Sequence, residues 1–160
     1  MDIQSVAEKF NFNTCCTKPL RTVFTAQSKT FFYCKDAICE FVFNNEMLPV
    51  NPFMVFDYFL NDRVDRDLIR RANNHLLSIC DEVWIFGDIS NGVMFEIIWA
   101  KKLKKPVRYF SIATKSNEIV EVTLNDLTFE KELSLTKEQI AEFILLVTSP
   151  EYRFLDRHDK

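Results

Sequence analysis

Glycine is scarce in this chain: it has 2 glycines in 160 residues, where average usage would give about 11. Both of them, Gly87 and Gly92, fall in one six-residue loop. Glycine is needed where φ is positive or where a ligand must approach the backbone closely. The loop is therefore the first place to look for a binding site.

Long basic stretches and long apolar runs are also missing. The net charge is −3, which argues against a large nucleic-acid-binding surface. No apolar run approaches the roughly 20 residues that a membrane span needs, and the first residues do not resemble a signal peptide. We expect a cytoplasmic protein without nucleic-acid or membrane partners.

Metal-binding patterns are lacking as well. The 5 cysteines include no C-x-x-C, and the 2 histidines, His75 and His158, are far apart. This argues against a zinc site and favours reduced thiols. We expect no metal and no cofactor, and we expect three cysteines on buried faces: Cys34, Cys39 and Cys80.

What is present suits one folded domain, because 48% of the residues are hydrophobic and the length is that of a single core. We predict an arm over 1–20, an α/β domain over 21–148 and a tail over 149–160. The periodicity predicts strands over 21–26, 47–50, 82–86, 106–110 and 119–124, a helical turn within 53–60, and helices over 30–46, 66–79, 93–104 and 137–148.

Two of these helices have N-caps in the sequence, Asp65 and Thr136. For the helix over 66–79 we expect an inner face of Leu68, Ala72, Leu76, Leu77 and Ile79. The run over 82–86 is apolar on both faces, as in a central parallel strand. Strands alternating with helices predict a mostly parallel sheet covered on both sides.

The loop over 87–92 joins that central strand to a helix N-terminus. Ligands of such sheets bind at the carboxyl ends of the strands, and the first helical turn offers N–H groups that suit a phosphate or carboxylate. The alternative is a tight turn in which Ser90 or Asn91 is an ordinary N-cap. We expect a positive φ at Gly87, and we expect Gly92 at the first helical position with a negative φ.

Glu96 lies just beyond the loop, among apolar neighbours. Helical geometry aligns it in one stripe with Gly92, Phe95 and Trp99. Its carboxylate either lies on the surface at a favourable dipole position or is held in the crevice, and the stripe favours the crevice.

These residues resemble the nucleoside 2-deoxyribosyltransferase superfamily, including its 5′-monophosphate N-hydrolase relatives. The resemblance covers about 21–110 and is carried by five segments: Leu48-Pro49-Val50-Asn51-Pro52, 80–87, 90–97, Ala100 and Lys105-Pro106-Val107. It implies a flavodoxin-like or Rossmann-like three-layer fold and chemistry at an N-glycosidic bond.

The resemblance also implies residue roles. In that superfamily, a glutamate at the position of Glu96 attacks the anomeric carbon and forms a glycosyl-enzyme intermediate. The transferases have an aspartate at the position of Ser90, whereas the monophosphate hydrolases have a serine that binds phosphate. Ser90 therefore favours a nucleotide, and we expect the loop residues Gly87, Asn91 and Gly92 to contact the substrate too.

One position departs from the pattern. Asn73 stands where the hydrolases have an acidic residue, and an amide is no acid at pH 7. Asp88, in the loop, is a candidate substitute, and together they would orient the base. The alternative is a non-catalytic module that binds a nucleotide as a sensor or sponge.

Three further expectations are less specific. Arg63 belongs to an arginine-rich segment that either clamps a phosphate or forms a solvated face. Phe24 is one of several phenylalanines that could stack on a base. Members of the resembled superfamily are commonly homodimers or larger, so we predict a homo-oligomer.

Overall fold

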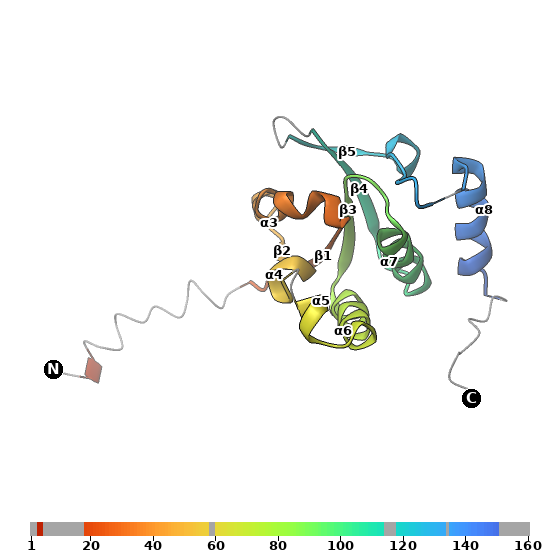
Figure 1. The fold of residues 1–160 in the computed structure, drawn as a ribbon. Helices are drawn as coiled ribbons and strands as arrows, with labels where there is room; N and C mark the ends of the chain where they lie inside the picture. The colour runs from red at the N-terminus through yellow and green to blue at the C-terminus, as the bar shows by residue number, and fades with distance from the viewer. Residues whose placement is uncertain (1–2, 5–17, 58–59, 114–117, 134, 151–160) are drawn as a thin grey trace.

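The computed structural model describes residues 3–4, 18–57, 60–113, 118–133 and 135–150, so most of the predicted arm and tail lies outside the described residues. The five strands are β1 (Thr22–Gln27), β2 (Leu48–Val50), β3 (Glu82–Phe86), β4 (Val107–Ile112) and β5 (Ile119–Val122). They form one sheet in the order β2-β1-β3-β4-β5 (Figure 1). The first four are parallel and β5 is antiparallel to β4. The mostly parallel, flavodoxin-like sheet is confirmed, with its last strand reversed.

The helices follow the predicted positions with small shifts. They are η1 (Lys29–Cys34), α3 (Lys35–Asn44), α4 (Pro52–Val55), α5 (Leu60–Arg63), α6 (Arg66–Ile79), α7 (Asn91–Lys102), η2 (Leu124–Asp126) and α8 (Lys137–Thr148). Both predicted caps are confirmed: Asp65 accepts hydrogen bonds from two N–H groups of α6, and Thr136 forms a capping box with Gln139. The predicted helix over 30–46 is instead a 3-10 segment followed by α3.

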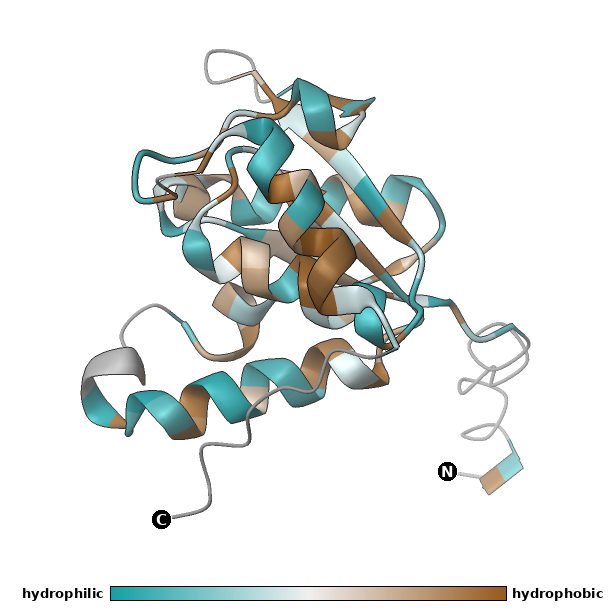
Figure 2. Ribbon diagram, turned by 90° about the vertical axis from the view of Figure 1, so that its right-hand side faces the viewer, coloured by the Kyte–Doolittle hydropathy of each residue, from teal (hydrophilic) through white to brown (hydrophobic). Residues whose placement is uncertain are grey.

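The sheet separates two hydrophobic clusters. On one side α3 packs Ile38 and Val42 against Val23, Trp84 and Phe110 of the sheet. On the other side the strands pack against α6 and α7, and α8 covers α7. Figure 2, where α8 faces the viewer, shows hydrophobic residues in the C-terminal half of this outer helix. Helices thus cover both faces and leave the strand ends to form sites.

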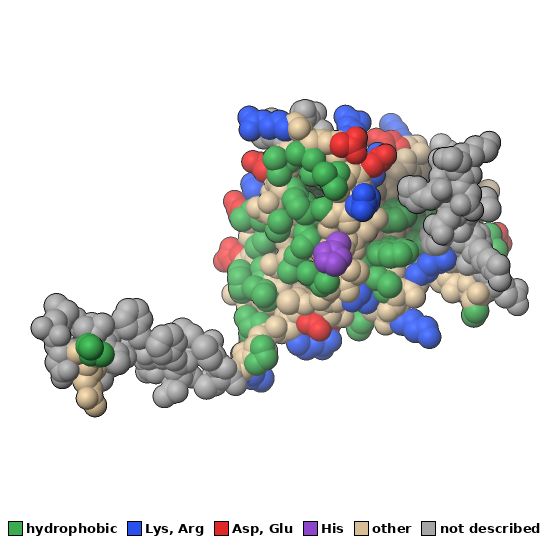
Figure 3. Space-filling view, turned by 90° about the horizontal axis from the view of Figure 1, so that it is seen from below, with side chains coloured by type: hydrophobic (Ala, Val, Ile, Leu, Met, Phe, Trp, Pro, Cys, Tyr) green, Lys and Arg blue, Asp and Glu red, His purple; other side chains and the backbone are tan. Residues whose placement is uncertain are grey.

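The inner face of α6 is narrower than its sequence suggests. Leu77 is fully buried, but Leu68 is 52% exposed and Ile79 is 62% exposed. The expectation that both point inward is wrong, because 3.6 residues per turn place Leu68 and Ile79 on the side of α6 opposite to the buried Leu77. The view from below in Figure 3 shows apolar side chains gathered on the surface of the molecule.

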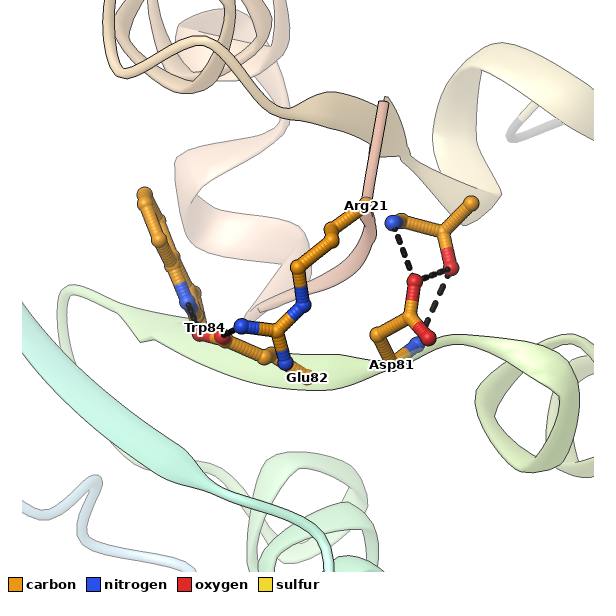
Figure 4. A network of polar contacts seen from close by, with 5 residues as sticks. Arg21, Asp81, Glu82 and Trp84 are labelled. Atoms are coloured by element: carbon orange, nitrogen blue, oxygen red, sulfur yellow. Dashed lines mark hydrogen bonds and ion pairs between the residues drawn. The ribbon is translucent and has the colours of Figure 1, made fainter. Parts of the chain in front are cut away.

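At the amino ends of β1 and β3, hydrogen bonds and an ion pair connect polar groups of the two strands (Figure 4). Asp81 accepts hydrogen bonds from the Thr22 amide at 2.6 Å and from the Thr22 hydroxyl at 2.9 Å. Glu82, which is 8% exposed, pairs with Arg21 at 2.9 Å and accepts from the indole of Trp84 at 2.8 Å. These contacts set the register of the central strands.

No helix in the described ranges is long and apolar enough to cross a lipid bilayer.

Candidate functional site

The loop after β3 brings α7 to the carboxyl edge of the sheet. Ser90 is the N-cap of α7, and its hydroxyl accepts from the amide of Val93 at 3.3 Å. Asn91 is the first helical residue and Gly92 the second, one position later than predicted for Gly92. Glu96 follows one turn further on, so its side chain lies beside the strand ends.

The Glu96 carboxylate is desolvated and held by one donor. Its side chain is half-buried, and the amide of Asn73, on α6, donates to Glu96 Oε1 at 2.7 Å. Burial raises the pKa of Glu96 to about 7, although the bond from Asn73 acts in the opposite direction. Near neutral pH this group is therefore poised between its acid and its carboxylate forms.

Three adjoining cavities share Glu96 in their walls. The first, of about 180 Å³, lies between β1, α4 and α6, and the second, of about 360 Å³, lies at the N-terminus of α7. The third, of about 350 Å³, lies between α6 and α7 and includes Asn74 and Phe95. A ligand spanning two of these cavities would pass directly over the carboxylate.

Two buried polar atoms of the first cavity have no hydrogen-bond partner in the part of the chain that the structure describes. They are Thr25 Oγ1 and Asn73 Oδ1. Thr25 is fully buried. A buried polar atom without a partner costs stability unless a ligand or water satisfies it. Both atoms therefore mark this wall as a place for a polar ligand.

A buried amide pair supports the same wall. Asn51 donates to Gln27 Oε1 at 2.8 Å, and Gln27 donates to the carbonyl of Phe31 at 2.8 Å. The carbonyl oxygen of the Asn51 side chain caps α4 by accepting from the amide of Phe53 at 2.9 Å. This network fixes Gln27 and Phe53, which both line the first and second cavities.

Five of the predicted site residues converge here. Asn73, Asn91, Gly92 and Glu96 line the cavities, and Ser90 both caps α7 and lines the second one. Residues from α6 and from the loop after β3 are thus brought together at one edge of the sheet. No group of three or more His, Cys, Asp or Glu side chains suited to a metal occurs within the described residues.

Gly87 and Phe24 are placed elsewhere, and their predicted contacts with substrate are corrected. Gly87 has the expected positive φ, +73°, but an added Cβ would come within 2.9 Å of the Phe31 ring. Gly87 therefore allows a tight turn next to Phe31. It is not among the residues that line the three cavities. Phe24 is fully buried in the core, in the middle of β1, so Thr25 and Gln27 nearer the strand end reach the cavity instead.

Asp88 and Arg63 also lie outside the cavity walls. Asp88 is half-buried, and its pKa is raised by burial first and by Glu130 second. Arg63 is exposed at the end of α5, whereas Arg70 of α6 lines the first and third cavities. The arginine in these walls is thus a later member of the same segment.

The sequence did not single out several residues of the walls: Thr25, Gln27, Asp57 and Glu130. Asp57 has a φ of +54°, a conformation that aspartate tolerates better than most residues. Its position after Asn51-Pro52 was the one available signal, since turn residues cluster there. No pattern in the sequence around Glu130 indicated a site. Its position depends on the pairing of Phe129 with Ile89, which lies far away in the sequence.

Comparison with curated proteins finds no match to this chain. Among solved structures, the chain is similar to a 2-desoxiribosyltransferase from Leishmania mexicana, with 18% identity and a TM-score of 0.44, over 78% of this chain and 97% of that one. One family profile, described as "Domain of unknown function (DUF7768)", matches residues 23–110, which run from β1 to β4 and include Glu96. That match covers more than half of the 160 residues, and the chain belongs to this family.

Proposed function

We propose that the protein cleaves or exchanges the N-glycosidic bond of a (deoxy)nucleoside or nucleoside 5′-monophosphate, with Glu96 as the nucleophile. The observation that carries the proposal is the desolvated Glu96 carboxylate where three cavities meet, beside two buried polar atoms without partners. The sequence resemblance at residues 80–97 supports the same chemistry.

The reaction has two steps. A carboxylate oxygen of Glu96 bonds to the anomeric carbon while the bond from that carbon to the base breaks, and the base nitrogen takes the electron pair and a proton from water. In the second step, water or a second base attacks the same carbon, the Glu96 carboxylate leaves, and the proton released by the attacking group goes to the hydroxide that the first step left behind. Water gives hydrolysis, and a second base gives exchange.

The walls suggest how a substrate would lie. Phe53 and Phe56 provide flat apolar surface for a base in the first cavity. Asn73 holds Glu96 through its amide N–H and has a carbonyl oxygen left to accept an N–H of the base. Asp57 lines the same cavity, and in this proposal it takes the base-orienting role first considered for Asp88.

The test is to incubate the protein with nucleosides and 5′-monophosphates, with and without a second base, and to measure the bases by chromatography. Glu96→Gln should abolish release and exchange, because an amide is a poor nucleophile. Glu142→Gln, on the exposed side of α8, removes the same charge and should behave as wild type. A quenched reaction should contain a glycosyl adduct at Glu96 by mass spectrometry. Turnover that survives in Glu96→Gln would refute the proposed nucleophile.

A second candidate is a binding module that holds the same ligand without turnover. Asn73 favours it, because no acid stands where the resembled hydrolases have one. Thermal shift against a nucleoside and nucleotide library identifies a ligand, since stabilisation grows with the ratio of ligand concentration to Kd. Tight binding without base release supports this candidate, especially if Asn73→Asp then gains release.

A further inference from the structure

Glu130 is fixed at the mouth of the second cavity by a pairing between distant parts of the chain. The amide of Ile89 donates to the carbonyl of Thr128 at 2.9 Å, and the amide of Glu130 donates to the carbonyl of Ile89 at 2.9 Å. Phe129 and Ile89 thus form a parallel bridge beside the loop after β3. The segment 128–130 thereby becomes part of the site.

The Glu130 side chain is also held in one orientation. The hydroxyls of Ser28 and Thr30 both donate to Glu130 Oε1, the latter at 3.1 Å. Within the described residues, no hydrogen bond or ion pair reaches the second oxygen, Oε2. A carboxylate that is held through one oxygen and has its second oxygen without a donor can accept a hydrogen bond from a ligand hydroxyl.

The charges around this cavity oppose a phosphate. Its walls include the carboxylates of Glu130 and Glu132, together with Lys29 as their one cation, and no ion pair joins Lys29 to either glutamate in the described ranges. The N-terminus of α7 contributes a partial positive charge of about half a unit. A phosphate dianion placed here would meet two carboxylates at close range.

The first cavity, lined by Phe53 and Phe56, is the more suitable place for a base, so the sugar of a bound substrate would extend past Glu96 into the second cavity. This step rests on the proposed function. We infer that Glu130 is a specificity-determining residue that selects a nucleoside, whose sugar hydroxyl it accepts, over the matching 5′-monophosphate. The inference runs against the preference for a nucleotide that Ser90 suggests.

The test uses one base in two forms, the nucleoside and its 5′-monophosphate, titrated calorimetrically into wild type, Glu130→Gln and Glu142→Gln. Wild type should bind the nucleoside at least tenfold more tightly. Glu130→Gln retains an oxygen for Ser28 and Thr30, and it should reduce this preference about tenfold by binding the monophosphate better and the nucleoside worse. Glu142→Gln, with the same change in charge on α8, should keep the wild-type preference.

A second measurement does not depend on the variant folding. If repulsion causes the preference, raising the salt concentration should reduce it in wild type by screening the carboxylates. A wild type that prefers the monophosphate, or a preference unchanged in folded Glu130→Gln, overturns the inference and leaves the proposed function standing. Absence of binding or turnover with both forms of every base overturns both.

Discussion

The two ends of the β1–β3 strand pair differ in whether their polar groups have hydrogen-bond partners within the protein. At the amino end, Asp81 receives hydrogen bonds from the Thr22 backbone and hydroxyl, and these bonds lower its pKa. At the carboxyl end, the hydroxyl of Thr25 has no partner within the described residues, and burial raises the pKa of Glu96 to about 7. One end is satisfied internally and stabilises the fold, whereas the other retains groups that a ligand would satisfy.

The largest expected gain in stability comes from replacing Glu96. Below pH 4.5 the group is protonated in both the folded and the unfolded states. Between pH 4.5 and about 7 only the unfolded state ionises, so stability falls as the pH rises, and above about 7 the loss is complete. That interval corresponds to at most about 3.5 kcal/mol, at about 1.4 kcal/mol per pH unit.

Glu96→Gln cannot ionise and should therefore be more stable than wild type above pH 7 by up to about 3.5 kcal/mol. Near pH 4 the two proteins should have the same stability. Denaturant unfolding at pH 4, 6 and 8 measures the difference, with Glu142→Gln as the control for charge. An equal difference at all three pH values would show that burial does not perturb Glu96.

The two glycines provide the second comparison, because they flank one loop and differ in purpose. Gly87→Ala meets both a positive φ and the Phe31 ring, and it should lose about 2–4 kcal/mol. Gly92→Ala has open space, with Ser90 Oγ the nearest atom at 3.8 Å, so stability should change by less than about 0.5 kcal/mol. Its methyl group would nevertheless enter the second cavity. Paired melting and binding measurements should separate the two effects, and full ligand binding by Gly92→Ala would place the ligand elsewhere.

The sequence predicted the strands, the caps at Asp65 and Thr136, and the positive φ of Gly87, because each depends on neighbouring residues. It could not choose between Phe24 and Thr25, since both belong to one apolar strand and only the position of the strand end decides which reaches a cavity. Glu130 lay beyond local reasoning, because its place depends on the pairing of Phe129 with Ile89. The association of Asn73 with Glu96 was expected only through the resemblance, and the hydrogen bond between them joins two helices.

A third prediction uses that hydrogen bond. Asn73→Asp replaces a donor to Glu96 with a second carboxyl group, so the pair should titrate together and the upper apparent pKa should rise above about 7. The expected rise is about one pH unit, or about 1.4 kcal/mol. Carbon-13 NMR of labelled glutamate and aspartate side chains, followed across pH, measures it. Asn74→Asp places a charge one residue further along α6, where no bond to Glu96 occurs, and should produce a smaller rise; an equal rise would make the effect a general one of charge.

The smallest expected effect uses two threonines on one strand, Thr22 and Thr25. The hydroxyl of Thr22 donates to Asp81 and accepts from the Asp81 amide at 2.9 Å, so Thr22→Val should lose about 1 kcal/mol. The hydroxyl of Thr25 has no partner in the described residues and is fully buried. Thr25→Val has nearly the same shape and should therefore gain up to about 1 kcal/mol in the absence of ligand, because it removes an unsatisfied polar atom.

The Thr25→Val change should also weaken binding of a ligand identified by thermal shift, whereas Thr22→Val should leave that affinity unchanged. We expect denaturant unfolding to show changes in stability of opposite sign for the two variants, and a loss of ligand affinity for Thr25→Val alone. This result would support the difference between the two strand ends. If both variants lose stability equally, the hydroxyl of Thr25 contributes to the fold, and the carboxyl end is no less satisfied than the amino end.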